Sequence, residues 1–342
     1  MKIALLTIAE QRKGGFAVAG GAAMFATQLW KALKIEGFEP ILFRVTANKN
    51  ESVGRTFMGG IPFQNVNEAL VPQIAREFPT IATYTYWKSR RSFTKLVLEL
   101  GLPIVLHDPA EMRDEFLSAV RGSSSPIVTI RGTTQRRLEA LKIPSMFIPH
   151  PYVRADLSCV APLPPVRGRS VARLDFRKHQ EIIVGANSLL PPEAHAEMWG
   201  DVNRMFAFHT LDAKHPQWKK WYRGVLPDEL GGARAYMTAD YAINLTTIKD
   251  DGDGTEYATL EAWDAGAISI VHKKWILTGK GELRPGETCL AVGNAGELAA
   301  LLAVRPYGAA YTAQRAAQLV QLASHAPAPV VGAYRPLLRR VR

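Results

Sequence analysis

Three acidic residues, Asp253, Glu256 and Glu261, lie in a stretch that reads as a Gly- and Asp-rich loop, a helix and an apolar strand. Thr255 is expected to cap the helix, where free backbone N–H groups and the helix dipole favour a bound anion. Glu256 and Glu261 are five residues apart, about 500° around a helix, so their carboxylates share no narrow face. We therefore expect them to hold different parts of one extended ligand. A surface helix that carries two acids is the alternative.

A second candidate for chemistry is the pair His107 and Asp108, which follows the apolar run 102–106. Such a run is typical of a buried parallel strand. Ligands of open α/β sheets bind outside the carboxyl ends of the strands, so the pair is well placed to face a reacting hydroxyl. Alternatively, Asp108 caps a helix beyond Pro109.

Two basic runs follow strands in the first half of the chain. One lies next to Tyr84, Tyr86 and Trp87, and the other follows the expected strand 126–130. Cations beside aromatic side chains suit phosphate pairing and base stacking, whereas a solvated helix start is the alternative. The candidate DNA-binding residues are Lys88, Arg90, Arg91, Arg131, Arg136 and Arg137.

The composition, 47% hydrophobic and 21% charged, is that of a soluble globular protein. No apolar run approaches the roughly 18 residues that span a bilayer, and the chain start reads as a buried strand rather than a signal peptide. We expect a cytoplasmic protein with no membrane partner, in the host cytoplasm if a phage encodes it. The two cysteines, Cys159 and Cys289, indicate neither a disulfide nor a zinc site. No metal site is expected.

The net charge of +11 favours a polyanionic partner, although a solvated basic surface would also account for it.

The order of apolar runs and turns predicts an α/β chain. It starts with a strand at 1–8, a turn with Gly20 and Gly21, a helix at 22–35 and a strand at 40–45, a βαβ unit whose helix start can face a phosphate or a sugar. A linker is expected at 161–168. Further strands are expected at 80–86, 102–106, 126–130, 196–200 and 239–245, and helices at 65–77, 297–304 and 309–323.

The stretch 253–271 resembles the site signature of the retaining GT-B glycosyltransferases, which use nucleotide sugars. In their pattern, two acids separated by seven residues precede an Ala, a Gly and a strand; Asp253 and Glu261 have this spacing, with Asp in place of the usual first Glu. The run EYATLE at 256–261, followed by Gly266, is more similar to the T-even phage DNA α-glucosyltransferases. Those enzymes also have a His-Asp pair at a strand end, facing the acceptor.

The resemblance covers most of the chain in order and implies two Rossmann-like domains that face a central cleft. Residues 1–153 would bind the acceptor and residues 154–325 the nucleotide sugar, while the tail 326–342 would cross back to the first domain. Gly20 and Gly21 would leave room for the donor sugar and its diphosphate; a flexible turn is the alternative.

Arg173 and Lys178 have the spacing of the family's two diphosphate-binding cations. Such fixed cations stabilise a departing nucleoside diphosphate without a metal. His179 departs from the family, which usually has Gly there, and a solvated Arg177-Lys178 pair is the alternative.

The resemblance also implies roles for the acids. Glu261 would hold the ribose hydroxyls, and Asp253 or Glu256 the sugar hydroxyls. The donor-binding candidates are Gly20, Gly21, Arg173, Lys178, Asp253, Gly254, Thr255, Glu256, Tyr257 and Glu261. The catalytic candidates are His107, Asp108, Arg173, Lys178 and Glu256.

The resemblance and the charge together predict a monomeric, phage-type DNA glycosyltransferase. It would move a sugar, with glucose expected, from a UDP-sugar to the hydroxymethyl group of 5-hydroxymethylcytosine or 5-hydroxymethyluracil in duplex DNA, with retention. The UDP-sugar is a co-substrate, and no tightly bound cofactor is expected. One alternative is a retaining glycosyltransferase acting on a polysaccharide, lipid or small molecule; another is a non-catalytic DNA-binding protein with a GT-B fold.

Overall fold

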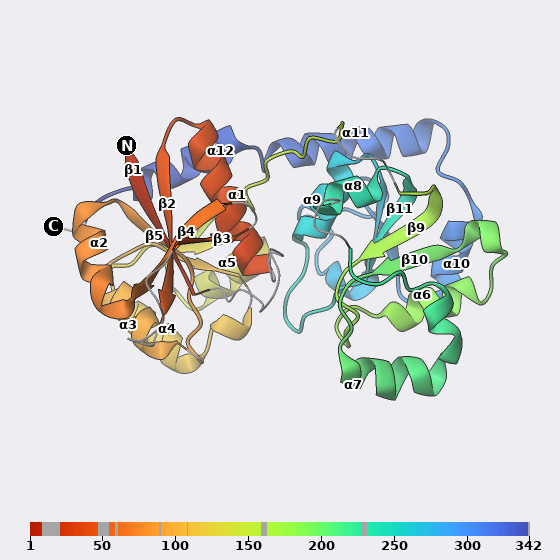
Figure 1. The fold of residues 1–342 in the computed structure, drawn as a ribbon, viewed down its shortest axis with the longest axis horizontal. Coiled ribbons are helices and arrows are strands. Elements are labelled where there is room, and N and C mark those ends of the chain that lie inside the picture. The colour runs from red at the N-terminus through yellow and green to blue at the C-terminus, as the bar shows by residue number, and fades with distance from the viewer. Residues whose placement is uncertain are drawn as a thin grey trace. The chain divides into compact units, whose positions relative to one another are not determined.

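The computed structural model describes residues 1–8, 21–46, 55–58, 61–88, 90–107, 109–158, 163–226 and 231–340. Its contacts divide the chain into two α/β units, shown in Figure 1. The first consists of Met1–Val153 and Ser324–Arg342, and the second of Arg154–Ala323. The sequence predictions at Gly20 and Asp108 lie outside the described residues.

The first unit contains, within the described ranges, a sheet in the order β3-β4-β2-β1-β5-β6-β7-β8. All neighbours are parallel except β3 and β4. The strands are β1 (Lys2–Thr7), β2 (Glu39–Thr46), β3 (Arg55–Met58), β4 (Ile61–Asn67), β5 (Thr80–Tyr84), β6 (Ile104–Leu106), β7 (Ile127–Thr129) and β8 (Met146–Phe147). The helices are α1 (Gly21–Ile35), α2 (Val71–Glu77), α3 (Arg91–Glu99), α4 (Asp114–Arg121), α5 (Gly132–Ala140) and α12 (Pro327–Tyr334).

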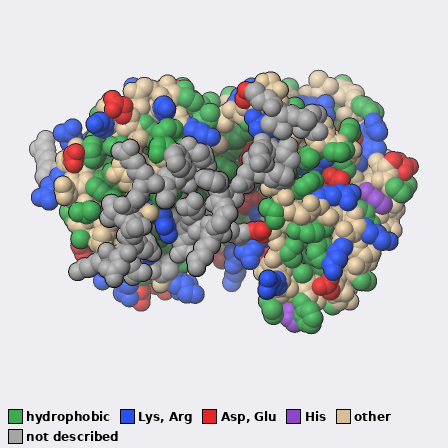
Figure 2. Space-filling model, in the orientation of Figure 1, with side chains coloured by type: hydrophobic (Ala, Val, Ile, Leu, Met, Phe, Trp, Pro, Cys, Tyr) green, Lys and Arg blue, Asp and Glu red, His purple; other side chains and the backbone are tan. Residues whose placement is uncertain are grey.

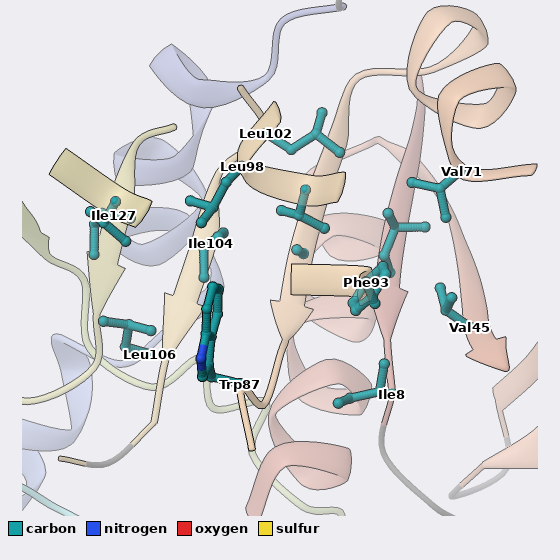
Figure 3. Close-up of a cluster of buried hydrophobic side chains, with 14 of the residues drawn as sticks. Ile8, Val45, Val71, Trp87, Phe93, Leu98, Leu102, Ile104, Leu106 and Ile127 are labelled. Carbon is teal, nitrogen blue, oxygen red and sulfur yellow. The ribbon is translucent and has the colours of Figure 1, made fainter. Parts of the chain in front are cut away.

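The central strand β1 is buried from its second residue onward, as a strand covered by helices on both faces must be. One hydrophobic cluster joins side chains from β1 to residues of β2, β6, α3 and α4. Figure 3 shows Trp87 in this cluster together with Ile104, Leu106 and Ile127. The core thus fixes the strand ends from which the candidate acceptor residues emerge.

The predicted helix at 65–77 is wrong in its first part, because β4 continues to Asn67 and α2 begins only at Val71. Here β4 pairs in parallel with β2 up to Thr46 and Asn67, and Val66 is buried in the core. Pairing with a strand distant in sequence overrides the local helical pattern.

The second unit has a parallel sheet in the order β10-β9-β11-β12-β13 within the described residues. The strands are β9 (Val166–Val171), β10 (Ala196–Trp199), β11 (Ala239–Asn244), β12 (Ile268–His272) and β13 (Leu290–Val292). The helices are α6 (Gln180–Asn187), α7 (Arg204–Phe206), α8 (Gly231–Tyr236), α9 (Tyr257–Asp264), α10 (Ala295–Ala303) and α11 (Ala309–Ala323). The end of the expected linker 161–168 is therefore strand, because β9 pairs with β11 from Val166 onward.

The C-terminal segment after Ala323 belongs to the first unit. Its helix α12 packs against α1, and Tyr152 donates its backbone N–H to the carbonyl of His325 at 2.7 Å. Further along, the Arg335 guanidinium lies over the Phe38 ring. Residues from both ends of the sequence thus complete one core.

A substitution in the middle of β9 tests the packing of the second unit. A Cβ on Gly168 would lie 2.8 Å from Ile243 Cδ1 and 3.0 Å from both Ala196 Cβ and Leu302 Cδ2. We expect Gly168→Ala to lower the free energy of unfolding by about 1–3 kcal/mol, measured by urea denaturation. The control is Gly332→Ala in α12, where no atom of a described residue lies within 4 Å of the added Cβ; it should be neutral or stabilising. Equal stability of the Gly168→Ala variant and the wild type would contradict this packing.

Candidate donor site and acceptor edge

Arg173 and Lys178 flank the turn that follows β9. The Arg173 side chain is 53% exposed, and its Nε lies 3.5 Å from Asp175 Oδ2. Gln180 braces the turn: its amide oxygen accepts from the Asp175 N–H at 3.1 Å, and its amide nitrogen donates to the Arg173 carbonyl at 3.0 Å. The Lys178 N–H donates to the Asp175 carbonyl at 2.9 Å. Local hydrogen bonds therefore hold both cations at the entrance to α6.

The Lys178 ammonium lies in a polar network at the carboxyl ends of β9 and β11. Its Nζ is 3.3 Å from both carboxylate oxygens of Glu256 and 2.5 Å from Thr246 Oγ1. Asn244 Nδ2 donates to Glu256 Oε2 at 2.7 Å, and Thr246 Oγ1 lies 2.7 Å from the same oxygen. The Lys178 and Glu256 side chains are 25% and 18% exposed, so a ligand can reach both. Glu256 is the N-cap residue of α9, but its side chain makes no capping hydrogen bond there, and its carboxylate instead orients Lys178.

The backbone at His179 has a left-handed conformation, with φ of 51°. This is the region that Gly adopts most easily. His179 therefore has the backbone conformation that suits the Gly usually found at this position in the GT-B glycosyltransferases. The His179 ring lies 2.9 Å from Glu181 Oε1 through Nδ1 and 2.8 Å from Thr247 Oγ1 through Nε2. It stacks on His272 with centroids 4.9 Å apart. Burial, with the nearby His179, lowers the pKa of His272. These contacts offset the strain of a non-Gly residue at this position.

The Glu261 carboxylate packs directly on the backbone at the start of α8. A Cβ on Gly232 would lie 1.9 Å from Glu261 Oε2, so only Gly permits this approach. Although the residue keeps some exposed surface, burial of its carboxyl group, with Asp264 as the second cause, raises its pKa to about 8. Asp264 is itself buried and accepts from Arg154 Nε at 2.5 Å. A hydroxyl of a bound nucleotide sugar could exchange a hydrogen bond with the Glu261 carboxyl group, which stays protonated up to about pH 8.

Two loop residues of the acidic stretch have different surroundings from those expected. Asp253, with φ of 59°, is buried, and its carboxylate accepts from the Leu277 N–H at 2.7 Å and the Thr278 hydroxyl at 2.6 Å. Thr255 donates its N–H and hydroxyl to Glu282 Oε2 at 2.7 and 2.9 Å. The expected Thr255 cap is therefore wrong: this contact holds Thr255 in the loop, and α9 begins at Tyr257. A sugar-binding role of Asp253 stays a prediction, beside the loop-bracing role that these contacts show.

Other residues of the network were not singled out from the sequence. Asn244 ends β11 and Thr246 follows it, and their polar types at the carboxyl end of an apolar strand are the signal that could have found them. Among the remaining donor candidates, the Gly254 carbonyl accepts from Trp275 Nε1 at 2.8 Å, and Tyr257 is buried. These two help to shape the loop before α9.

In the first unit, His107 follows β6 with a fixed ring. Its Nε2 lies 2.7 Å from the Thr83 carbonyl oxygen, which only accepts, so Nε2 carries a proton. The ring meets Phe25 and Tyr84 edge-on, at 5.0 and 5.3 Å between centroids. At the start of α1, no atom of a described residue lies within 4 Å of a Cβ built on Gly21. The oriented imidazole of His107 is suited to ligand binding.

The basic candidates lie at the same edge of the sheet as His107. Lys88 and Arg90 follow β5, and Arg131 follows β7; β6 lies between these two strands and is parallel to both. Because the carboxyl ends of parallel strands meet at one edge, the topology brings the cations and His107 to one side of the unit.

Several of these cations have acidic partners or are buried. Arg90 Nη1 lies 3.9 Å from Glu68 Oε1, and Arg91 Nη1 lies 3.2 Å from Glu115 Oε2. Arg131 is buried at the entrance to α5. The exposed positions are Lys88, Arg91, Arg136 and Arg137. A solvent-facing phosphate contact is thus easiest to make at Lys88, Arg136 and Arg137, because Arg91 already pairs with Glu115.

No cluster of three or more His, Cys, Asp or Glu side chains in the described ranges is arranged to hold a metal ion. Among the same residues, the helices are too short or too polar to cross a bilayer.

No protein-family model matches the chain, and no curated protein sequence matches it. Solved structures, by contrast, do match the chain. HepE from Anabaena in complex with UDP-glucose is 16% identical, with a TM-score of 0.67 and 99% of each chain covered. Sucrose-phosphate synthase from Thermosynechococcus elongatus is 15% identical, with a TM-score of 0.66 and 98% of each covered. An α-glucosyltransferase bound to UDP-glucose and DNA with an abasic site is 12% identical, with a TM-score of 0.63; 99% of this chain and 100% of that one are covered. The expected α/β GT-B fold is therefore confirmed.

The raised pKa of Glu261 makes stability depend on pH. The unfolded chain loses the proton near its ordinary value of 4.5, whereas the folded protein keeps it until about pH 8. The folded state thus binds more protons between these values, so stability should fall as pH rises from about 5 to 8. At pH 8.5, Glu261→Gln should be more stable than the wild type by about 4–5 kcal/mol, because each pKa unit corresponds to about 1.4 kcal/mol.

Melting temperatures between pH 5 and pH 9 check this expectation. Glu193→Gln, at an exposed position, is the control and should follow the wild-type curve. A Glu261→Gln curve parallel to that of the wild type would mean that the carboxyl group is not held in its neutral form.

Proposed function

We propose that this chain is a retaining glycosyltransferase that uses a UDP-sugar, with glucose as the sugar. The observation that carries the proposal is the network of Lys178, Glu256, Thr246 and Asn244 beside Arg173. It presents a fixed ammonium and a second, half-exposed cation at the carboxyl edge of a parallel sheet, where a diphosphate would bind. The Anabaena neighbour was solved with UDP-glucose, which supports the choice of donor.

In this proposal, the sugar C1–O bond to the diphosphate breaks, and its electron pair leaves with the diphosphate. Arg173 and Lys178 stabilise the charge that develops there. The acceptor hydroxyl attacks C1 from the same face, and its proton passes to the departing phosphate oxygen, so the anomeric configuration is retained. Glu256 keeps Lys178 in place and has a carboxylate oxygen within reach of a sugar hydroxyl, while Glu261 holds the ribose.

We infer further that the acceptor is a hydroxymethylated base in duplex DNA. The net charge of +11 supports this choice, as do the cations at the His107 edge. One structural neighbour is a glucosyltransferase bound to DNA. His107, and Asp108 after it, would lie near the acceptor hydroxyl. The base would have to be presented from the major groove or flipped out of the helix.

A polysaccharide, lipid or small-molecule acceptor is the second candidate. It is favoured by the ion pairs of Arg90 and Arg91 and by the burial of Arg131, which leave fewer cations for phosphates than the sequence suggested. It would use the same donor site. A non-catalytic role is less well supported, because Arg173, Lys178 and Glu261 are all present.

Arg173 and Lys178 form the proposed diphosphate clamp, and removal of either cation should slow sugar transfer strongly. We expect Lys178→Ala and Arg173→Ala each to lower kcat by about 100- to 1,000-fold, since loss of one preorganised donor costs about 3–4 kcal/mol. Release of UDP from UDP-glucose is the measurement. Lys280→Ala, at an exposed position outside the network, is the control. Wild-type rates in both clamp variants would remove the diphosphate site from the proposal.

Product analysis decides the acceptor. Radiolabelled UDP-glucose is incubated with duplexes that carry 5-hydroxymethylcytosine, 5-hydroxymethyluracil or only unmodified bases. We expect label only on a hydroxymethylated duplex, and an α-linkage in the product because retention preserves the configuration of the donor. UDP binding without label on any duplex would favour the second candidate; a β-linkage would refute retention.

A further inference from the structure

The helix that begins with α7 presents apolar side chains to solvent. It continues beyond α7 as a π-helix, Ala207–Asp212. Phe206, Ala207 and Leu211 pack into the core of the second unit. On the opposite side, Met205 is 59% and Phe208 67% exposed. π-Helical segments are frequent at functional sites, and neighbouring exposed apolar side chains often mark an interaction surface.

Exposed cations and a further aromatic side chain surround this helix. Phe176 is half-exposed and meets Phe206 edge-on at 5.2 Å, while the His209 ring lies 5.0 Å from that of Phe208. Arg177 and Arg204 are exposed, and neither makes an ion pair with another described residue. Figure 2 shows hydrophobic side chains beside Lys and Arg on the surface around α7. We name this surface the Phe208 face; it consists of Phe176, Arg177, Arg204, Met205, Phe208 and His209.

The Phe208 face is continuous with the candidate donor site. Phe176 and Arg177 belong to the turn that carries Arg173 at one end and Lys178 at the other. A molecule bound along the face would therefore lie next to the expected position of the diphosphate.

We propose that the Phe208 face binds nucleic acid through an unpaired stretch of bases. Phe208 and Phe176 stack on exposed bases, and Arg177 and Arg204 contact phosphates. This combination of stacking and cation pairing is the one used for single strands, where every base offers a flat face. The inference rests on the proposed DNA acceptor and adds a nucleic-acid contact on the second unit, which carries Arg173 and Lys178.

The size and charge of the face argue against two other occupants. A lipid chain of about 14 carbons, at about 0.8 kcal/mol per buried CH₂, gives only marginal membrane binding. Phe176, Met205 and Phe208, which are already partly buried, would contribute less free energy of membrane binding than that chain. A second copy of this chain would bring the same cations opposite each other, which disfavours self-association. A polyanion with stackable bases matches both the cations and the aromatic rings.

Binding of labelled oligonucleotides by fluorescence anisotropy tests the proposal. The probes are a fully paired duplex and the same duplex with a central single-stranded gap. We expect wild type to bind the gapped duplex more tightly, and Phe208→Ala to weaken that binding about fivefold to tenfold without changing the salt dependence. Arg204→Ala should also lower the slope of log K against log salt by about one.

The matched control is Tyr307→Ala, which removes an aromatic side chain that is 69% exposed elsewhere on the same unit. It should bind both probes like wild type. All variants should keep the wild-type thermal shift with UDP, which shows that fold and donor site are intact.

The outcomes separate this inference from the proposed function. Wild-type affinity of Phe208→Ala and Arg204→Ala for the gapped duplex would overturn the inference, even if glucose is transferred to DNA. A Phe208-dependent preference for the gapped duplex, without transfer to any DNA, would support the inference and refute the acceptor. Absence of DNA binding by wild type at low salt, or Phe208-dependent binding to phosphatidylglycerol vesicles instead, would overturn it.

Discussion

The ion pair between Lys178 and Glu256 is the interaction on which the candidate site depends. In the proposed function, Lys178 stabilises a leaving diphosphate, and such a cation must be fixed before the ligand arrives, since reorganisation during the reaction would cost part of its effect. The carboxylate of Glu256 supplies that fixation, and Asn244 and Thr246 hold the carboxylate in turn. Because both side chains keep exposed surface, the pair stays open to a substrate.

The two sheets place these groups by the same topological rule. Parallel strands end at a common edge, so residues far apart in sequence, such as Lys178 after β9 and Thr246 after β11, meet there. The loops at this edge accept unusual backbone geometry: His179 and Asp253 both have positive φ. Side-chain contacts made by each residue offset the strain. Loop conformation and polar contacts are therefore coupled at this edge.

The candidate acceptor edge of the first unit shows that the net charge of a chain differs from the charge available to a ligand. The sequence carries an excess of 11 positive charges, yet Arg90 and Arg91 have carboxylate partners and Arg131 is buried. Exposed, unpaired cations contribute most to contacts with phosphates, whereas a buried cation interacts with the protein groups around it. The Phe208 face is better suited to phosphate contacts, because its two arginines are exposed and make no ion pair among the described residues.

The sequence by itself determined the α/β class, the first βαβ unit and the limits of helices such as α11, since hydrophobic periodicity and Gly turns are local signals. Through the resemblance to the GT-B glycosyltransferases, the sequence also predicted Arg173 and Lys178 as diphosphate-binding cations, a role that stays a prediction. Only the tertiary structure decided which partner each polar group has. Glu282, 27 residues from Thr255, accepts the Thr255 hydrogen bonds, so Thr255 does not cap the helix. Pairing with β2 makes the start of the predicted helix 65–77 part of strand β4. Contacts between distant segments leave no periodic trace in the sequence, so the Asn244–Thr246–Glu256 support of Lys178 could be found only once the strands were brought together.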